Sequence, residues 1–176
     1  MDFEALKSSI IDNIVESQVK IGYEKTQISL YYPTESVMRL LGADCNTENL
    51  AAALNELCGL YTETLGEITV LFERERVRFS IPEKGAAYVH EHITDRGFIE
   101  DFIGVIRQNC TIDGILAVFS KYSDNVVFEE LNNGELEYLI YFADGKPDSY
   151  RYCIEFEMGR AVYHRFTPAD YAALDL

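Results

Sequence analysis

Between residues 126 and 166 the side chains alternate repeatedly between apolar and polar, and this pattern constrains the fold more than any other part of the chain. Tyr138, Ile140 and Phe142 point to one side of an extended segment, and Tyr152 and Ile154 repeat the pattern further on. A period of two with aromatic and β-branched residues is typical of β-strands. The alternation predicts strands over residues 126–131, 136–142, 150–157 and 161–166.

The segments between these strands are rich in residues that form turns. Asn132–Gly134 suits a tight hairpin, residues 143–149 form a longer loop, and Met158-Gly159 can serve as a two-residue turn. Short connections between neighbouring strands imply an antiparallel meander. We expect its apolar face to pack against helices and its mixed face to be partly solvated.

Apolar residues at helical spacing predict the helices that this sheet needs. The predicted helices cover residues 2–21, 33–41, 48–61, 94–109 and 111–122, and a short helix follows Thr167-Pro168. Asp2 and Thr111 are the expected N-caps of the first and fifth helices, and Asn46 or Thr47 that of the third. Ile21 and Leu60 are expected on buried faces.

The remaining segments are shorter. Residues 26–32 predict a strand, and residues 67–81 a hairpin with its turn near Arg74-Glu75. Residues 85–92 are compatible with a helix or with an irregular segment. Together these elements predict a single α+β domain over residues 1–176, with the N-terminal and central helices on one face of the C-terminal antiparallel β-meander. The earlier β-hairpin either extends that sheet or packs beside it.

Composition limits the compartment and the partners. The four cysteines (Cys45, Cys58, Cys110 and Cys153) form no C-x-x-C pair, so we expect reduced thiols in a cytoplasmic protein. No signal peptide and no apolar run of membrane-spanning length is evident. The net charge of −15 is spread along the chain. It disfavours nucleic acid and anionic membranes, and it favours a protein partner with a basic surface.

The sharpest local motif is His90-Glu91-His92. In a strand both imidazoles would lie on one face and suit a metal, whereas in a helix they diverge by about 200° and cannot chelate together. A third ligand would come from His164, Glu91 or Glu100. Because histidines near a helix end more often bond carbonyl groups, these three histidines are weak metal candidates and we assign no metal or other cofactor.

Cys153 and His164 form a second candidate. If Met158-Gly159 is the hairpin turn, the thiol faces the imidazole on the same side of the sheet, and the two can form a nucleophile pair. Neither a third orienting group nor an oxyanion site is identifiable. A buried cysteine beside a polar histidine explains the same pattern.

Charged and aromatic residues on the predicted strands supply the candidates for ligand binding. Arg74, Arg76 and Arg78 form the one basic cluster in the sequence, which suits a phosphate or carboxylate but also a solvated sheet face. Tyr141 and Tyr163 lie on the tyrosine-rich meander, as a recognition surface or as rings packed under a helix. Acidic pairs such as Glu155 and Glu157 are more typical of a solvated face than of a cation site.

Several segments together resemble a known family. They are Ile10-Ile11-Asp12-Asn13-Ile14, Leu30-Tyr31-Tyr32-Pro33, Tyr88-Val89-His90-Glu91-His92, Lys121-Tyr122-Ser123 and Tyr163-His164-Arg165-Phe166-Thr167-Pro168. Over the whole chain the sequence is similar to an uncharacterised domain-of-unknown-function family of clostridial gut bacteria. The resemblance implies a cytosolic bacterial protein and no activity, cofactor or catalytic residue.

The sequence therefore favours a non-enzymatic binding or interaction module with an acidic surface. Templates for phosphate loops, dinucleotide folds, serine hydrolases and helical zinc proteases are absent. The alternative is a small metal-dependent or thiol hydrolase that uses the three histidines or Cys153. It would be abandoned if His90 and His92 lay in a helix and Cys153 were buried.

Overall fold

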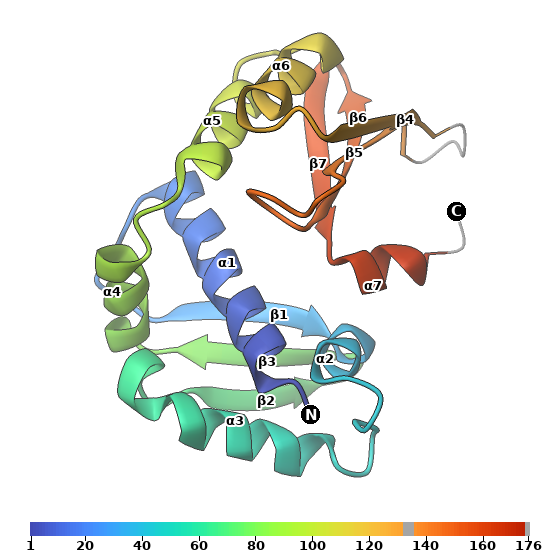
Figure 1. The fold of residues 1–176 in the computed structure, drawn as a ribbon. Coiled ribbons are helices and arrows are strands. Elements are labelled where there is room, and N and C mark those ends of the chain that lie inside the picture. The colour runs from blue at the N-terminus through green and yellow to red at the C-terminus, as the bar shows by residue number, and fades with distance from the viewer. Residues whose placement is uncertain (132–135, 175–176) are drawn as a thin grey trace. The chain divides into compact units, whose positions relative to one another are not determined.

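The computed structural model describes residues 1–131 and 136–174 (Figure 1). The chain forms two compact units, Met1–Arg96 and Gly97–Leu176, which we call the N-terminal unit and the C-terminal unit. The predicted turn at Asn132–Gly134 lies outside the described residues. The two units are described separately below, and the organisation as one domain stays a prediction.

The N-terminal unit combines four helices with a three-stranded sheet. Its elements in chain order are α1 (Phe3–Ile21), β1 (Ile28–Pro33), α2 (Thr34–Leu41), α3 (Leu50–Leu65), β2 (Thr69–Glu73), β3 (Arg76–Ile81) and α4 (Glu83–His92). The predicted hairpin is confirmed as β2 and β3, with Arg74 at a φ of 57° in the turn. The strand β1 pairs antiparallel with β3, so the hairpin belongs to a sheet of order β1-β3-β2. It does not extend the C-terminal meander.

Local signals at the ends of α1 act as expected. Asp2 accepts a hydrogen bond from the Ala5 amide, and Gly22 ends α1 at a φ of 88°, where glycine is favoured. The predicted N-cap of the third helix is wrong, because α3 begins later, with Asn49 as its N-cap. The Asn46 side chain instead accepts hydrogen bonds from the amides of Glu48 and Asn49 in the turn before α3. Segment 85–92 is helical, within α4.

Two predictions about buried faces are wrong. Ile21 is 73% exposed because it is the last residue of α1, beyond the packed turns. Leu60 is 56% exposed, whereas Leu54 and Leu57 are buried. At about 100° per residue, Leu60 is rotated away from the stripe that the other leucines form on α3.

The N-terminal core is mainly aliphatic. One face of the sheet presents Val77, Phe79 and Ile81, all fully buried, toward the helices. Within this core the Tyr32 hydroxyl lies 3.2 Å from Ser9 Oγ and accepts a hydrogen bond of 2.7 Å from Asn13 Nδ2. Since no helix of this unit covers the other face of the sheet, that face carries polar and partly exposed side chains.

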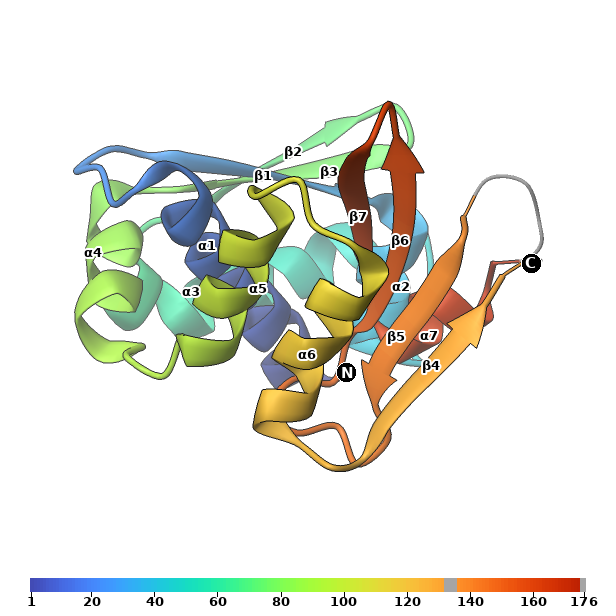
Figure 2. The same ribbon diagram turned by 90° about the horizontal axis from the view of Figure 1, so that it is seen from above.

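The C-terminal unit contains the predicted meander. Its elements are α5 (Gly97–Ile106), α6 (Ile112–Tyr122), β4 (Val126–Glu130), β5 (Tyr138–Phe142), β6 (Arg151–Glu157), β7 (Arg160–Phe166) and α7 (Pro168–Ala172). Figure 2 shows the four strands side by side in the order β4-β5-β6-β7, and all neighbours are antiparallel. Met158 and Gly159 form the predicted turn, with positive φ at both residues as a type I′ hairpin requires. The α+β class is confirmed.

Aromatic rings fill the C-terminal core. Phe98 from α5 lies edge to face against Phe119 of α6, Phe142 of β5 and Tyr152 of β6, with ring centroids 5.0, 5.0 and 5.8 Å apart. Helices α5 and α6 therefore cover the apolar face of the meander, as predicted for the central helices, whereas the N-terminal helices α1, α2 and α4 contact the three-stranded sheet of their own unit. The short helix α7 begins with Thr167 as N-cap and Pro168 in its first turn, and it contacts β7.

Candidate functional site

The first candidate surface is the uncovered face of the N-terminal sheet. Register places Tyr31 and Leu71 on either side of Arg78, and Glu73 beside Arg76, all pointing away from the buried Val77 and Phe79. We call the surface formed by Tyr31, Leu71, Glu73, Arg76 and Arg78 the open face. Tyr31 is 51% exposed and Leu71 is 42% exposed, which is unusual for large apolar side chains in the middle of strands.

The three arginines of the predicted basic cluster differ in their surroundings. Arg78 Nη1 lies 3.2 Å from Glu73 Oε1, and a hydrogen bond with the Tyr31 hydroxyl, together with the Glu73 charge, raises the pKa of Arg78. The Arg78 Nε atom is buried and makes no hydrogen bond to any described residue. Arg76 and Arg74 are exposed and form no ion pair within the described part of the chain. The guanidinium of Arg76 on this face, and that of Arg74 in the adjoining turn, are therefore available to an anionic partner.

The histidine motif lies on α4, where the geometry separates the two imidazoles. His90 stacks on Tyr23 with ring centroids 4.1 Å apart, and His92 Nδ1 donates to the Tyr88 carbonyl oxygen at 3.0 Å. Across residues 1–131 and 136–174, no three His, Cys, Asp or Glu side chains are grouped to hold a metal ion. His92 thus makes the carbonyl contact expected near a helix end, whereas the stacking of His90 on Tyr23 was not predicted.

The predicted pairing of Cys153 with His164 is confirmed, but the thiol is buried. The two residues are direct partners across β6 and β7. Cys153 is fully buried, and this burial raises the pKa of its thiol to about 11. His164 is exposed instead, with Nε2 3.0 Å from Glu155 Oε1. A thiol that stays protonated at neutral pH is a poor nucleophile, so both conditions for abandoning the hydrolase are met.

The two candidate tyrosines point to opposite faces of the meander. Tyr163 contacts Phe102 of α5, with ring centroids 4.8 Å apart, on the aromatic face. Tyr141 is on the other face, where the Arg151 guanidinium lies 3.7 Å from the centre of its ring. Of the two tyrosines, only Tyr141 therefore lies on the polar, partly solvated face of the meander.

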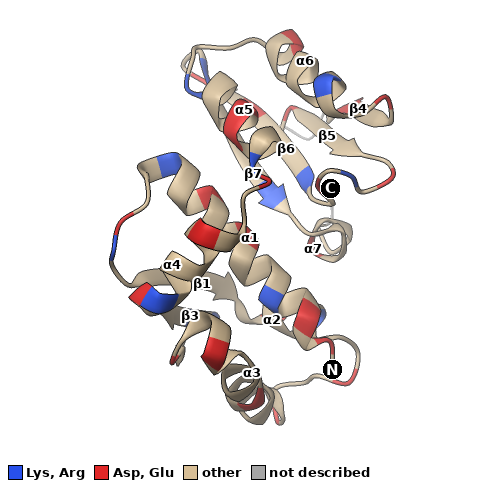
Figure 3. Ribbon diagram, turned by 60° about the vertical axis from the view of Figure 1, so that its left-hand side comes forward, with Lys and Arg blue, Asp and Glu red and all other residues tan. Residues whose placement is uncertain are grey.

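Helix α3 carries an acidic surface that the residue counts alone had not singled out. Residues 40–73 include six Asp or Glu and no Lys, Arg or His. Figure 3 shows acidic and no basic positions along α3, and the exposed Leu60 is flanked by the exposed Glu56 and Glu63 at helical spacing. We call Glu56, Leu60 and Glu63 the acidic face. The run without a base is visible in the sequence, but the exposure of Leu60 is not.

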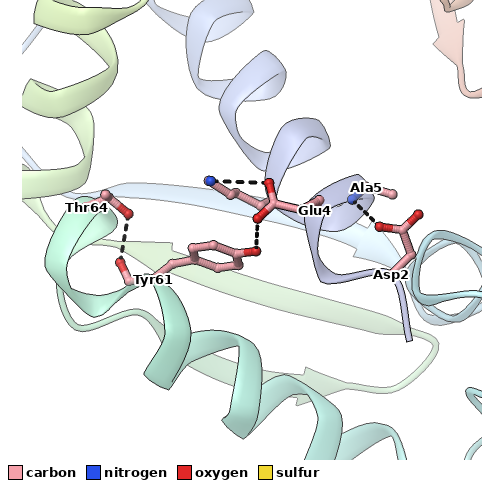
Figure 4. Close-up of polar contacts among 6 residues, drawn as sticks. Asp2, Glu4, Ala5, Tyr61 and Thr64 are labelled. Carbon is pink, nitrogen blue, oxygen red and sulfur yellow. Dashed lines mark hydrogen bonds and ion pairs between the residues drawn. The ribbon is translucent and has the colours of Figure 1, made fainter.

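A polar contact fastens α3 to α1 beside this surface (Figure 4). The Tyr61 hydroxyl donates to Glu4 Oε1 at 2.6 Å, and Lys7 Nζ lies 3.3 Å from Glu4 Oε2. The hydrogen bond from Tyr61 and the ammonium of Lys7 lower the pKa of Glu4. Desolvation and the same carboxylate raise the pKa of Tyr61 to about 12.

A pocket of about 300 Å³ lies at the end of α1 and was not predicted. It is lined by Ser17, Gln18, Ile21, Gly22, Glu24, Thr26, Gln27, Ile28 and Ser29. These residues belong to the last turn of α1, the connection after it and the start of β1. No spacing motif marks such a pocket, because it depends on how a connection folds against a helix end.

The fold is that of an α+β protein with two antiparallel sheets. The chain belongs to a family described as a domain of unknown function, E. rectale Gene description (DUF3877), whose model matches residues 3–175. This match confirms the resemblance to a family of clostridial gut bacteria. Neither the curated proteins nor the solved structures gave a match. Among the described residues, no helix has the length and apolarity to span a membrane.

Proposed function

We propose that this protein is a non-enzymatic binding protein that engages a protein partner through the open face. The observation that carries the proposal is a sheet face whose central side chains, Tyr31 and Leu71, stay exposed on either side of Arg78, with Arg76 exposed further along β3 and without an ion pair in the described chain. Tyrosine and arginine are the residue types most enriched at protein interfaces and at their energetic hot spots. The buried cysteine and the separated histidines lend no support to the hydrolase.

The chemistry of the open face specifies the partner. Arg74 and Arg76 supply unpaired positive charge, and a guanidinium binds a carboxylate through two parallel hydrogen bonds. Leu71 and the Tyr31 ring supply apolar area on either side of Arg78. The face therefore suits a protein segment that carries carboxylates and apolar side chains. The four free cysteines support a location in a reducing cytoplasm.

The test compares two triple variants of matched chemistry. The first, Tyr31→Ser with Leu71→Ser and Arg76→Glu, removes the open face. The control, Phe128→Ser with Met158→Ser and Arg160→Glu, changes an exposed aromatic, an exposed apolar and an exposed basic residue of the C-terminal unit. Circular dichroism establishes that both variants fold.

Each protein is used to capture partners from native lysate, and the partner is then purified and titrated by calorimetry. We expect one stoichiometric partner, bound by wild type and the control, with roughly a hundred-fold loss of affinity in the open-face variant. No stoichiometric partner, or an equal loss in both variants, would overturn the proposal.

A second surface, the acidic face of α3, suits a partner with a basic surface. The specific observation is an exposed leucine between two glutamates on a helix without a single base. A basic amphipathic segment would contact Leu60 and neutralise Glu56 and Glu63. Binding there should weaken steeply as salt is added, because exposed charges are screened over about 10 Å at 0.1 M salt. Glu56→Gln with Glu63→Gln should remove that salt dependence, and a partner whose affinity ignores both salt and this variant excludes the acidic face.

A further inference from the structure

The sheet of the N-terminal unit has two edges, and they differ in how they are protected. The order β1-β3-β2 places β1 on one edge and β2 on the other (Figure 1). The strand β1 ends in Pro33, which has no N–H and hinders the pairing of a further strand with that edge. The strand β2 contains no proline, lysine or glycine, and its register with β3 runs without a bulge from Thr69 to Glu73. The less protected edge is therefore that of β2.

The hairpin turn determines which backbone groups of β2 point to this edge. Because the turn has two residues, Glu73 and Arg76 beside it form a pair that exchanges both hydrogen bonds. Since bonding to β3 alternates along the strand, the N–H and C=O groups of Val70 and Phe72 point away from β3. These groups have no other backbone partner among the described residues, and β3 is the single described strand beside β2. They are free to bond an added strand.

The exposed apolar side chains of β2 lie on both faces of the sheet. Leu71 belongs to the open face and is 42% exposed. Phe72 pairs with the buried Val77 on the helix-facing side and is still 52% exposed. A ligand on one face would cover only one of these side chains, whereas a strand added to the edge would lie beside both. The exposure pattern therefore points to strand addition, a common mode of recognition between proteins.

The charge around this edge indicates where the added strand comes from. Residues 67–78 carry three acids and three bases, so their net charge is zero within a chain of net charge −15. The six residues are Glu67, Glu73, Arg74, Glu75, Arg76 and Arg78. A large net charge keeps copies of a protein apart, but this hairpin adds nothing to that repulsion. The neutral, apolar edge therefore favours a second copy of this chain.

We propose that two copies of this protein pair antiparallel through β2, about a two-fold axis at Leu71. In this register Val70 of each copy exchanges both backbone hydrogen bonds with Phe72 of the other, so every group that points to the edge is bonded. Leu71 lies against its own counterpart, and Phe72 lies against Val70. Glu73 lies against Thr69, so no like charges face each other. The two three-stranded sheets join into one continuous sheet.

Other two-fold registers give poorer side-chain pairs. With the axis at Phe72, Leu71 would face the carboxylate of Glu73. With the axis at Val70, Glu73 would face Glu67, and like charges directly opposite each other are destabilising. The register centred on Leu71 avoids both pairs. This pairing uses the edge of the sheet and needs no other protein, so it does not depend on the proposed function.

Sedimentation equilibrium of the purified full chain tests the pairing. We expect the average mass to rise with concentration from 20.1 kDa toward twice that value. Phe72→Lys places a charge at the edge, leaves the open face unchanged and should weaken dimerisation by roughly a hundred-fold. The matched control is Phe128→Lys, which changes a 38% exposed phenylalanine on β4, an edge strand of the other sheet, and should have no effect.

Three outcomes of this experiment would overturn the proposal. The first is a wild type that stays monomeric up to about 1 mM, a concentration that detects even weak pairing. The second is a dimer that Phe72→Lys leaves intact, and the third is an equal loss in Phe72→Lys and Phe128→Lys. Circular dichroism establishes that both variants fold.

Cross-linking tests the register and does not rely on the lysine variant. Leu71→Cys places two thiols directly opposite each other, where Cα atoms about 4.5 Å apart allow a disulfide. Thr69→Cys places them about 14 Å apart, which no disulfide spans. On treatment with copper phenanthroline we expect a covalent dimer from Leu71→Cys, and none from Thr69→Cys or from wild type, which carries the four native cysteines. No covalent dimer from Leu71→Cys, or as much from Thr69→Cys, would contradict the pairing.

Discussion

The two units of this protein reach a similar α+β composition by different routes. In the C-terminal unit the strands follow one another in chain order, and an aromatic core joins Phe98, Phe119 and Tyr152. In the N-terminal unit β1 pairs with β3 across two intervening helices and a strand, and the core is mainly aliphatic. The C-terminal sheet thus pairs strands that are neighbours in the chain, whereas the N-terminal sheet also needs a pairing between strands that are far apart in the chain.

This difference explains where each unit exposes its sheet. The meander has helices on its apolar face and α7 beside its other face, next to β7. The N-terminal helices all precede or follow strands of a sheet that they cover from one side. The second face of that sheet is left with Tyr31, Leu71 and the arginines. The unit with the more non-local strand pairing is therefore the one with a sheet face that its own helices leave uncovered.

The largest expected effect compares one buried phenylalanine from each core. Phe79→Ala and Phe119→Ala each empty a fully buried position and should cost about 3–5 kcal/mol of unfolding free energy. If the chain is a single cooperative domain, calorimetry shows one transition, and either substitution shifts it. Two transitions, of which each variant moves only one, would show that the units unfold independently.

Alanine substitutions at two glycines of the N-terminal unit should change the free energy of unfolding in opposite directions. A Cβ on Gly85 would lie 2.5 Å from the carbonyl oxygen of Leu65 and 2.5 Å from Ile81 Cγ2, so Gly85→Ala should destabilise by about 1–3 kcal/mol. A Cβ on Gly59 of α3 meets nothing within 4 Å. Gly59→Ala should therefore stabilise by about 1 kcal/mol. Urea unfolding midpoints measure both, and a stable Gly85→Ala variant would disprove the close approach of α4 to α3.

The N-caps of α1 and α6 allow a comparison between the two units in which the expected losses of unfolding free energy are smaller. Asp2 accepts from the Ala5 amide at 2.9 Å, and Thr111 accepts from the Gly114 amide at 3.3 Å. Asp2→Ala and Thr111→Ala should each cost about 1 kcal/mol, measured by urea unfolding. We expect the larger loss for Asp2, since its bond is shorter and its charge also favours the helix N-terminus. A larger loss for Thr111 would mean that α6 depends on its cap more than α1 does.

The smallest effect concerns the Tyr61–Glu4 contact, which is exposed. The pKa of Glu4 is lowered from 4.5, so its stabilising contribution is present above that pH and is lost as pH falls through the lowered value. The pKa of Tyr61 is raised from 10.0 to about 12, so its contribution is present below pH 10.0 and is lost as pH rises toward 12. Tyr61→Phe should therefore be slightly less stable than wild type at neutral pH.

Thermal unfolding of wild type and Tyr61→Phe tests this window. The difference between them should shrink below pH 4.5, where the carboxylate of Glu4 becomes protonated. Thr64→Val, which alters a neighbouring hydroxyl bonded to the Tyr61 carbonyl, should show no such dependence on pH. A constant difference for Tyr61→Phe down to acid pH would indicate lost packing and not a lost hydrogen bond.

Much of the C-terminal unit could be predicted because its information is local. Alternation identified the strands, Met158-Gly159 identified the turn, and that turn placed Cys153 opposite His164. The same reasoning could not show that the thiol is buried, since burial depends on elements beyond the two strands. It also could not join β1 to β3, because the sequence between them gives no register.

The candidate sites follow the same division. The basic cluster was predictable from the spacing in the sequence, with Arg76 and Arg78 on β3 and Arg74 in the turn before it. Glu73 and Tyr31 contact the guanidinium of Arg78, whereas Arg76 has no ion pair among the described residues. This difference depends on which residues the neighbouring strands place beside each arginine. No pattern in the sequence indicates the pocket at Gln18. The position of the Gln18 amide depends on its hydrogen bond to the carbonyl oxygen of Ala86 in α4, which is far along the chain.

The sequence alone determined the helices, their caps, the meander, the acidic charge and the family. These properties depend on residues a few positions apart, where backbone geometry fixes which side chains share a face. Tertiary structure decided the partner of β1, the isolation of the histidines, the burial of Cys153 and the free edge of β2. Each of these depends on contacts between distant segments, whose positions are set by packing of the whole unit and by no short stretch within it.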